Sequence, residues 1–140
     1  GCDGAAPSNL DLFDEIKALR YSMIAYWGLP SFNPVVMTCP TLLKMAAWGG
    51  ANAIGKGDIL GAVEEGRKAD VILLNIDQPH LTPTQNLINT IVEAANGHDV
   101  TDSIINGKIV MKNREVLTLD EEKVRREAQI HMEEIIKRAY

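Results

Sequence analysis

Cysteine, histidine and long apolar runs are all scarce in this chain. Its two cysteines, Cys2 and Cys39, form no CxxC pair and no Cys/His cluster, which argues against a structural zinc site and a disulfide framework. A chain without a disulfide framework is typical of the cytoplasm, so we expect a cytoplasmic protein. No apolar run reaches the roughly 18 residues that a membrane span requires. The sequence therefore predicts no membrane segment.

The charge balance argues against a nucleic-acid partner. Acidic residues outnumber basic ones, 19 to 14, and the formal net charge is -5. No basic stripe of the kind that binds phosphate backbones is present. The chain has 140 residues, of which 46% are hydrophobic, enough for a core in one domain or two small units.

The first third of the chain is predicted to be helical. Apolar residues recur at helical spacing between residues 9 and 27, with Ser8 as the expected N-cap. The loop 28–34, rich in Gly and Pro, should end this helix. A second helix is expected over Thr41–Trp48, interrupted by Gly49-Gly50 and followed by one more turn that Gly55 closes.

The later part is predicted to form strands and one final helix. The continuous apolar run Val71–Ile76 favours a strand buried on both faces. Leu87–Ala95 is assigned to a strand by its Ile91-Val92 centre, with a helix as the alternative that its Ala94-Ala95 end favours. Asn106-Gly107 is typical of a type I′ turn in a β-hairpin, because both positions need positive φ. After a short strand at Glu115–Leu117, a capping box of Thr118 and Glu121 should start the last helix. That helix carries one apolar stripe, made of Val124, Ala128, Met132, Ile135 and Ala139.

Four segments, in fixed order, resemble metal-dependent amidohydrolases. Residues 1–6 resemble the loop after the eighth barrel strand, and residues 42–46 together with 50–55 resemble a late helical segment of that family. Residues 61–72 resemble the entry into its small β domain, and residues 100–110 resemble a later hairpin there. The branch indicated includes adenosine-type, guanine, triazine and S-adenosylhomocysteine/methylthioadenosine hydrolases. Pro79-His80-Leu81-Thr82-Pro83 especially resembles the last of these, whereas Pro7 departs from the branch's usual Ser or Asn.

The resemblance implies an α/β fold that is the C-terminal fragment of a larger enzyme. Residues 1–57 would be the last part of a (β/α)8 TIM-type barrel, comprising the end of strand eight and the closing helices. Residues 58–118 would be the C-terminal part of a β-sandwich domain, and residues 119–140 a C-terminal helix. The partner expected for this chain is the rest of the barrel, and the resemblance also allows a homo-oligomer.

The chemistry implied by the resemblance centres on Asp3. This residue would be both a ligand of one divalent metal, zinc or iron, and the proton shuttle in the deamination of a purine, adenosine-type, pterin or triazine compound. The family's His-x-His pair is missing from this chain, and a catalytic zinc normally needs about three protein ligands. We therefore expect the isolated chain to be inactive. Two alternatives remain: a non-catalytic α/β interaction module, and a subunit that complements a separately encoded barrel.

The other chemistry-bearing residues are interpreted as structural. Metal ligation by Cys2, an active-site role for His80 and pocket lining by the two tryptophans are the weaker alternatives. The expected structural roles are small-residue packing by Cys2, loop anchoring by His80, a turn at His98, interface packing by His131, core packing by Trp27 and Trp48, and a structural hydrogen bond by Asp70.

Overall fold

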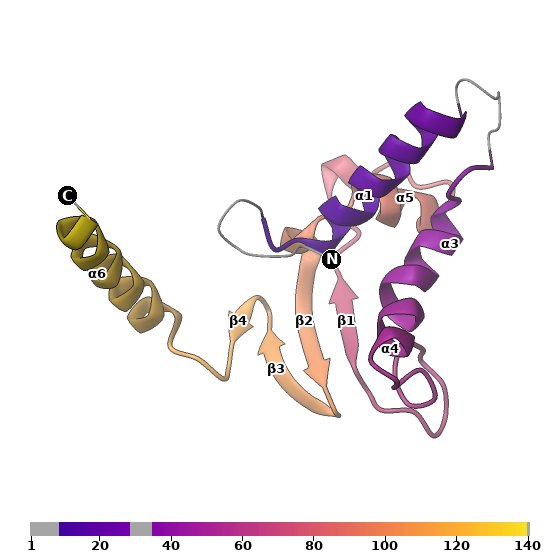
Figure 1. Ribbon diagram of the computed structural model, residues 1–140. Helices are drawn as coiled ribbons and strands as arrows, with labels where there is room; N and C mark the ends of the chain where they lie inside the picture. The colour runs from indigo at the N-terminus through magenta and orange to yellow at the C-terminus, as the bar shows by residue number, and fades with distance from the viewer. Residues whose placement is uncertain (1–8, 29–34, 140) are drawn as a thin grey trace.

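The computed structural model describes residues 9–28 and 35–139, which form a group of helices, one sheet and a separate final helix (Figure 1). The elements, in chain order, are α1 (Leu12–Met23), η1 (Ile24–Gly28), α3 (Cys39–Lys44), η2 (Met45–Gly49), α4 (Gly50–Ala53), β1 (Val71–Leu74), η3 (Pro79–Leu81), α5 (Leu87–Ala94), η4 (Gly97–Asp99), β2 (Val100–Ile105), β3 (Lys108–Lys112), β4 (Glu115–Val116) and α6 (Glu121–Ala139). Within the described ranges, no helix combines the length and apolar character needed to cross a bilayer.

The first helix begins later than the sequence pattern predicts. Ser8, the expected cap, lies outside the described residues. The N-cap is Asp11, whose extended backbone and Oδ1 atom, 2.9 Å from the Phe13 amide, satisfy a free N–H of the first turn. From Leu12 the helix runs as predicted, and it ends in the π-helical turn η1.

The second helical segment is continuous, so the predicted interruption at Gly49-Gly50 is wrong. Segments α3, η2 and α4 follow one another without a break, and both glycines have helical φ and ψ near -61° and -44°. Each glycine costs a helix about 1 kcal/mol relative to alanine. Burial of Leu42 before the pair and Ala51 after it offsets that cost, because both side chains are packed out of solvent.

Residues 87–94 form helix α5, which corrects the assignment of Leu87–Ala95 to a strand. Asn86 caps this helix, with its Oδ1 atom 3.1 Å from the Asn89 amide. Val92 and Ala95 are fully buried, and α5 packs against both α1 and α3. The cap and this tertiary packing override the β preference of the branched residues at the centre of the segment.

The helices share a small core. Ile16 from α1, Cys39 and Leu42 from α3, and Val92 from α5 form its buried cluster. Arg20 of α1 links the three helices at the rim of this core. It forms an ion pair with Glu93 of α5 at 2.8 Å, and it donates to the carbonyl of Met37, just before α3, at 2.6 Å.

The sheet is antiparallel throughout, in the order β1-β2-β3-β4. The predicted hairpin is confirmed: Asn106 and Gly107, with φ of 50° and 77°, connect β2 to β3. The predicted structural role of Asp70 is also confirmed, because its Oδ1 accepts from the Asn106 amide at 2.6 Å and ties β1 to that turn.

Strand β1 is not buried on both faces, contrary to the prediction. It lies at the edge of the sheet, and about half of the surface of Ile72 and of Leu73 is exposed. The prediction that Trp27 and Trp48 pack in the core is also wrong. In the described structure Trp27 is 53% exposed and Trp48 is 40% exposed. Both lie in π-helical turns, and Trp48 carries the Lys44 ammonium 4.9 Å from its ring centroid.

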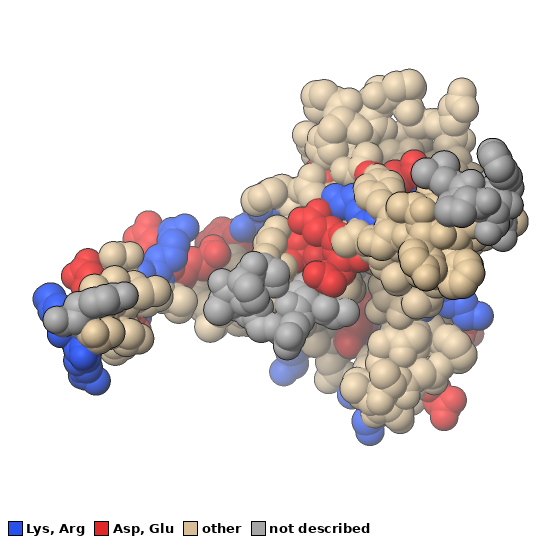
Figure 2. Space-filling view, turned by 45° about the horizontal axis from the view of Figure 1, so that its top comes forward, with Lys and Arg blue, Asp and Glu red and all other residues tan. Residues whose placement is uncertain are grey.

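Helix α6 stands apart from the rest of the described chain (Figure 1), and in Figure 2 it projects from the body with basic and acidic side chains on its surface. None of its 19 residues is buried, so the predicted apolar stripe is exposed. The helix starts after Asp120, whose Oδ1 accepts from the Lys123 amide at 2.9 Å, rather than at the predicted capping box of Thr118 and Glu121. The side chain of His131 is 72% exposed and does not pack in this chain.

Candidate functional site

The two sequence-predicted residues of the N-terminal loop, Asp3 and Cys2, lie outside the described residues. The description begins at Asn9, two residues before the cap of α1. The described part of the site therefore begins with the start of helix α1, which follows the predicted metal-binding residues in the chain.

Asp11 holds the start of helix α1 in place by accepting two backbone hydrogen bonds from different parts of the chain. Its Oδ1 atom accepts from Phe13 in its own helix at 2.9 Å. Its Oδ2 atom accepts at 2.7 Å from the amide of Gly97, which is 86 residues further along the chain. An ionised carboxylate suits this position, because it faces the positive end of α1 and forms stronger hydrogen bonds than a neutral group.

Asp11 lies so close to Gly97 that a side chain at position 97 would be in tight contact with it. A Cβ atom on Gly97 would lie 3.1 Å from Oδ2 of Asp11, a tight contact that would force the carboxylate to shift by a few tenths of an ångström.

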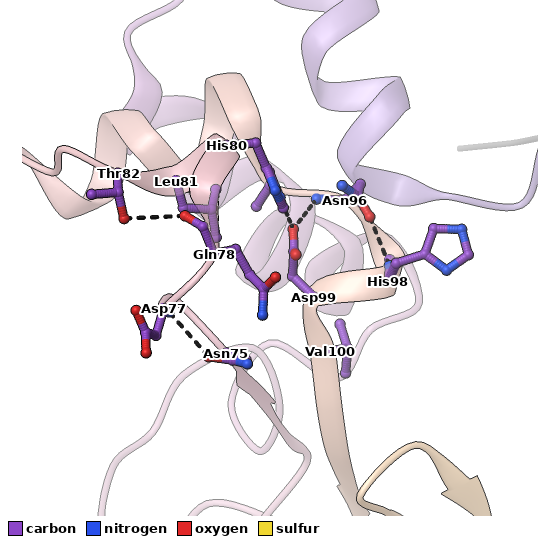
Figure 3. Close-up of polar contacts among 12 residues, drawn as sticks. Asn75, Asp77, Gln78, His80, Leu81, Thr82, Asn96, His98, Asp99 and Val100 are labelled. Atoms are coloured by element: carbon purple, nitrogen blue, oxygen red, sulfur yellow. Dashed lines mark hydrogen bonds and ion pairs between the residues drawn. The ribbon is translucent and has the colours of Figure 1, made fainter.

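The turn η4 that carries Gly97 is itself fixed by a reciprocal cap. The side chain of Asn96 accepts from the His98 amide at 2.8 Å, and the Asn96 amide donates to Oδ2 of Asp99 at 2.9 Å (Figure 3). Arg114, which follows β3, donates to the carbonyls of His98 and Val100. Backbone groups of the turn are thus satisfied from both sides, which makes η4 a rigid anchor.

Asp99 links this anchor to the loop that contains His80. Its carboxylate is only 4% exposed, and Nε2 of His80 lies 3.0 Å from its Oδ2 atom (Figure 3). Burial raises the pKa of Asp99, but hydrogen bonds from His80 and the Asn96 amide outweigh this, so the pKa lies below the ordinary value. The ionised carboxylate requires a proton on Nε2 of His80. The predicted role of His80 as a loop anchor is confirmed.

Residues of this network line two hollows. One, of about 410 Å³, lies between the start of α1 and η4 and is lined by Asn9, Leu10, Asp11, Leu12, Phe13, Gly97, His98 and Arg114. The other, also of about 410 Å³, has a polar lining that includes His80, Gln85, Asn86, Asn89, Thr90 and Glu93. Asp11 and Gly97 thus line one of these hollows, and His80 lines the other.

The described residues do not form a metal site by themselves. Nowhere in residues 9–28 and 35–139 do three or more His, Cys, Asp or Glu side chains gather as a metal would need. The three histidines are dispersed: His80 pairs with Asp99, His98 lies beside Arg114, and Nδ1 of His131 lies 3.8 Å from Glu134. Asp3, the metal ligand that the sequence predicts, lies outside these described residues.

Sequence reasoning missed two residues of the network. The sequence pattern placed the first cap at Ser8 and not at Asp11, although an aspartate directly before Leu-Phe fits an N-cap. Asp99 was passed over, although the spacing Asn96-x-x-Asp99 fits a cap with a returning carboxylate. The contact between Asp11 and Gly97 had no local signal in the sequence.

Comparison with known proteins assigns the family. The sequence model described as "Amidohydrolase family" matches residues 1–110. A 5-methylthioadenosine/S-adenosylhomocysteine deaminase of Desulforamulus reducens is 42% identical over 125 residues, which cover 89% of this chain and 28% of the relative. A 5'-deoxyadenosine deaminase of Methanosarcina acetivorans is 40% identical over 140 residues, covering 99% of this chain and 31% of the relative. The chain thus spans less than a third of the length of the relatives it matches.

Solved structures agree with this assignment. An adenosine deaminase from Xanthomonas campestris with bound zinc superposes with a TM-score of 0.83 at 26% identity, over 90% of this chain and 28% of that one. The zinc complex of an atrazine chlorohydrolase from Arthrobacter aurescens shares the fold, with a TM-score of 0.71 at 22% identity, over 82% of this chain and 25% of the other. Because the family model matches residues 1–110, from before Asp3 into β3, this chain belongs to the amidohydrolase family.

Proposed function

We propose that this chain is the C-terminal part of a metal-dependent aminohydrolase that deaminates an adenosine-type compound. The observation that carries the proposal is the identity of about 40% to two deaminases across nearly the whole chain, within a family match that begins at residue 1. The names of these relatives favour a 5'-modified adenosine over the guanine, pterin and triazine compounds that the sequence also allows.

The chemical role proposed for this chain is that of Asp3. A divalent metal, zinc or iron, would supply an acidified water molecule when bound to the complete site. Asp3 would contribute one carboxylate to that site, accept a proton from the water and return it to the leaving amine. A carboxylate can do both, because it binds a cation and exchanges a proton within hydrogen-bond reach. The zinc in the Xanthomonas deaminase supports a divalent metal without deciding between zinc and iron.

The apolar surface of the helices supports the proposal that the rest of a barrel covers them. Leu12 and Leu19 of α1 and Met45 of η2 are exposed. Hollows of about 300 and 240 Å³ lie between α1 and the second helical segment, the smaller with an almost wholly apolar lining. Contiguous apolar hollows of this kind mark contact surfaces. On this proposal residues 1–57 complete a barrel, residues 58–118 belong to a β-sandwich and residues 119–140 form the C-terminal helix.

A chimera tests the proposal. The segment of the Desulforamulus deaminase that matches this chain, 28% of its length, would be replaced by this chain, and ammonia release from 5'-methylthioadenosine would be measured after metal loading. We expect activity in the chimera and none in its Asp3→Asn variant, with Asp14→Asn as the control for removal of a nearby carboxylate. Activity that survives Asp3→Asn would refute the role of Asp3. A folded, metal-loaded chimera without activity would favour the non-catalytic alternative.

The isolated chain provides a second test. Because Asp3 alone cannot replace about three protein ligands, we expect no stoichiometric zinc binding in the sub-micromolar range. Calorimetric titration measures this directly. A tight site that disappears in Asp3→Asn would show that the chain holds its metal without a barrel, and would contradict the proposal.

A further inference from the structure

We infer that the free edge of strand β1 pairs with a strand from the part of the parent enzyme that lies outside this chain. That strand would also place a large apolar side chain in the hollow between β1 and the helices. The inference rests on the proposed function, because the pairing strand would come from the rest of the longer enzyme. It assigns a partner of defined chemistry to this surface: an extended segment with apolar residues at alternate positions.

The first observation is that β1 lacks the features that protect natural edge strands. It ends the sheet on the side that lies toward helix α4 in Figure 1, and it reads Val-Ile-Leu-Leu, without a charge or a proline. The opposite edge, β4, is only two residues long and includes Glu115. Short or charged edges discourage pairing, whereas a longer apolar edge is a template for a further strand. Of the two edges, β1 is therefore the one suited to receive a strand.

The irregular pairing of β1 with β2 does not block this edge. Two consecutive residues of β1, Leu73 and Leu74, lie opposite residues 102 and 100 of β2. The extra residue, Thr101, therefore belongs to β2. Strand β1 itself has no inserted residue, so its outer side can continue the sheet.

Backbone contacts at both ends of β1 show which of its groups face β2. The Ala69 carbonyl accepts from the Gly107 amide at 3.0 Å, and the Asn75 amide donates to the Asp99 carbonyl at 2.8 Å. The Leu73 carbonyl accepts from a threonine hydroxyl of β2 at 3.4 Å. In an antiparallel pair every second residue directs its N–H and C=O groups toward the neighbouring strand. The odd-numbered residues from 69 to 75 therefore face β2.

Ile72 and Leu74 consequently direct their backbone N–H and C=O groups to the free edge. Within residues 9–28 and 35–139, these groups have no hydrogen-bond partner in another segment. The side chains of Ile72 and Leu73 lie on opposite faces of the strand, and each is about half exposed. Apolar residues on both faces are typical of a strand inside a sheet, where neighbours cover both of its edges.

The second observation is an apolar hollow at the same strand. It has a volume of about 240 Å³ and an almost wholly apolar lining, made of Leu12, Phe13, Ile16, Leu43, Ala46, Ala47 and Ile72. In a strand paired with β1, the residue opposite Ile72 points to the same face as Ile72 itself. An apolar side chain there would enter the hollow and remove both its own surface and the lining from water.

The size of the missing part favours a strand of the same enzyme over a second copy of this chain. This chain covers 28% of the Desulforamulus deaminase and 31% of the Methanosarcina deaminase, so most of such an enzyme lies outside it. The segment that pairs with β1 must also fit against α1 and η2, because residues of both line the hollow. A strand that carries an apolar side chain at that position satisfies both requirements.

Residue-resolved amide hydrogen exchange tests the pairing without any activity. The isolated chain is compared with the chimera that joins it to the rest of the Desulforamulus deaminase. In the isolated chain, the outward amides of Ile72 and Leu74 should exchange faster than the inward amides of Val71 and Leu73. In the chimera this ratio of outward to inward rates should fall by about 10-fold or more, because the outward amides gain partners. The ratio corrects for a change in the stability of the whole protein.

Three results of this comparison would overturn the inference. An unchanged ratio in the chimera would show that the edge stays unpaired. Slow outward amides in the isolated chain at every concentration would show that the edge is already satisfied within the chain. Outward amides that slow as the concentration of the isolated chain rises would identify a second copy as the occupant.

A substitution that fills the hollow tests the inserted side chain. Ala47→Leu should raise the urea midpoint of the isolated chain, because it buries apolar surface in the open hollow. In the chimera the same substitution should lower the midpoint, because the hollow is already filled and becomes overpacked. Ala18→Leu is the control, since Ala18 lies about 200° around α1 from the buried Ile16 and should have a small effect in both proteins. An equal effect of Ala47→Leu in both proteins would refute the insertion.

The two proposals fail separately. A chimera that deaminates its substrate while the outward amides of β1 stay fast refutes the pairing and leaves the proposed function intact. A chimera in which these amides are slowed, but whose activity survives Asp3→Asn, refutes the proposed role of Asp3 and leaves the pairing intact.

Discussion

Replacement of Asp99 by asparagine should destabilise the chain at neutral pH by an amount that disappears in acid. Asp99 is 4% exposed, and its Oδ2 atom accepts from Nε2 of His80 at 3.0 Å and from the Asn96 amide at 2.9 Å. Asparagine can keep both bonds through its oxygen, but they lose their charge assistance. Since a charge-assisted bond contributes roughly twice as much as a neutral one, the two together should cost about 1–3 kcal/mol.

The pH dependence follows from the direction of the pKa shift. Burial raises the pKa of Asp99, but the hydrogen bonds from His80 and the Asn96 amide lower it below the ordinary value. A lowered native pKa means that the stabilisation is present above the pKa of the unfolded chain, and is lost as pH falls through the native value. Below that value both states carry a neutral carboxyl group, so wild type and Asp99→Asn should be equally stable.

Urea denaturation followed by far-UV circular dichroism measures the difference from about pH 6 downward, across the carboxyl range. The control is Asp77→Asn, which removes an exposed carboxylate near the His80 loop, and it should change stability by less than about 0.5 kcal/mol. A difference for Asp99→Asn that stays constant into acid, or that never appears, would refute the account of the Asp99–His80 network.

Three further predictions concern other parts of the chain. Gly61→Ala should lower the free energy of unfolding by more than about 2 kcal/mol, because its φ is +86° and a Cβ would lie 2.5 Å from the backbone of η2. Gly66→Ala is the control: Gly66 has the same φ but open space around it, so the same urea denaturation assay should show a loss of only about 1 kcal/mol. Cys39 in a Cys2→Ser background should react slowly with a disulfide reagent until the chain unfolds, because burial raises the pKa of its thiol and hides it; rapid reaction of the native chain would contradict this. Deletion of residues 121–140 should leave the urea midpoint within error of the full chain, since α6 buries no residue; a large shift would show that α6 packs on the body.

Local signals in the sequence predicted the elements whose geometry is set by a few neighbouring residues. Asn106-Gly107 determines a hairpin turn through its positive φ angles, and the apolar spacing from Leu12 to Met23 determines α1. The failures have tertiary causes. The branched residues of α5 favour a strand until the cap at Asn86 and packing of Val92 decide for a helix. Burial of β1 on both faces was predicted from its apolar run alone, although burial depends on neighbouring elements.

The candidate site likewise combines residues that the sequence predicted with contacts that only the fold shows. Asp3 was predicted from a resemblance and stays a prediction, since it lies outside the described residues. The link from Asp11 to Gly97 joins segments 86 residues apart and follows only from the fold. His80 was correctly interpreted as an anchor, but its partner Asp99 became evident only when η3 and η4 were seen side by side (Figure 3).

Ammonia release by the metal-loaded chimera, with and without Asp3→Asn, tests the central claim most directly. The chimera joins this chain to the part of the Desulforamulus deaminase that it does not match. The chimera and its Asp3→Asn variant differ only at residue 3. We predict that the chimera deaminates 5'-methylthioadenosine and that Asp3→Asn abolishes the activity while leaving the fold intact. Equal activity in the two proteins would contradict the claim that this chain contributes a catalytic carboxylate.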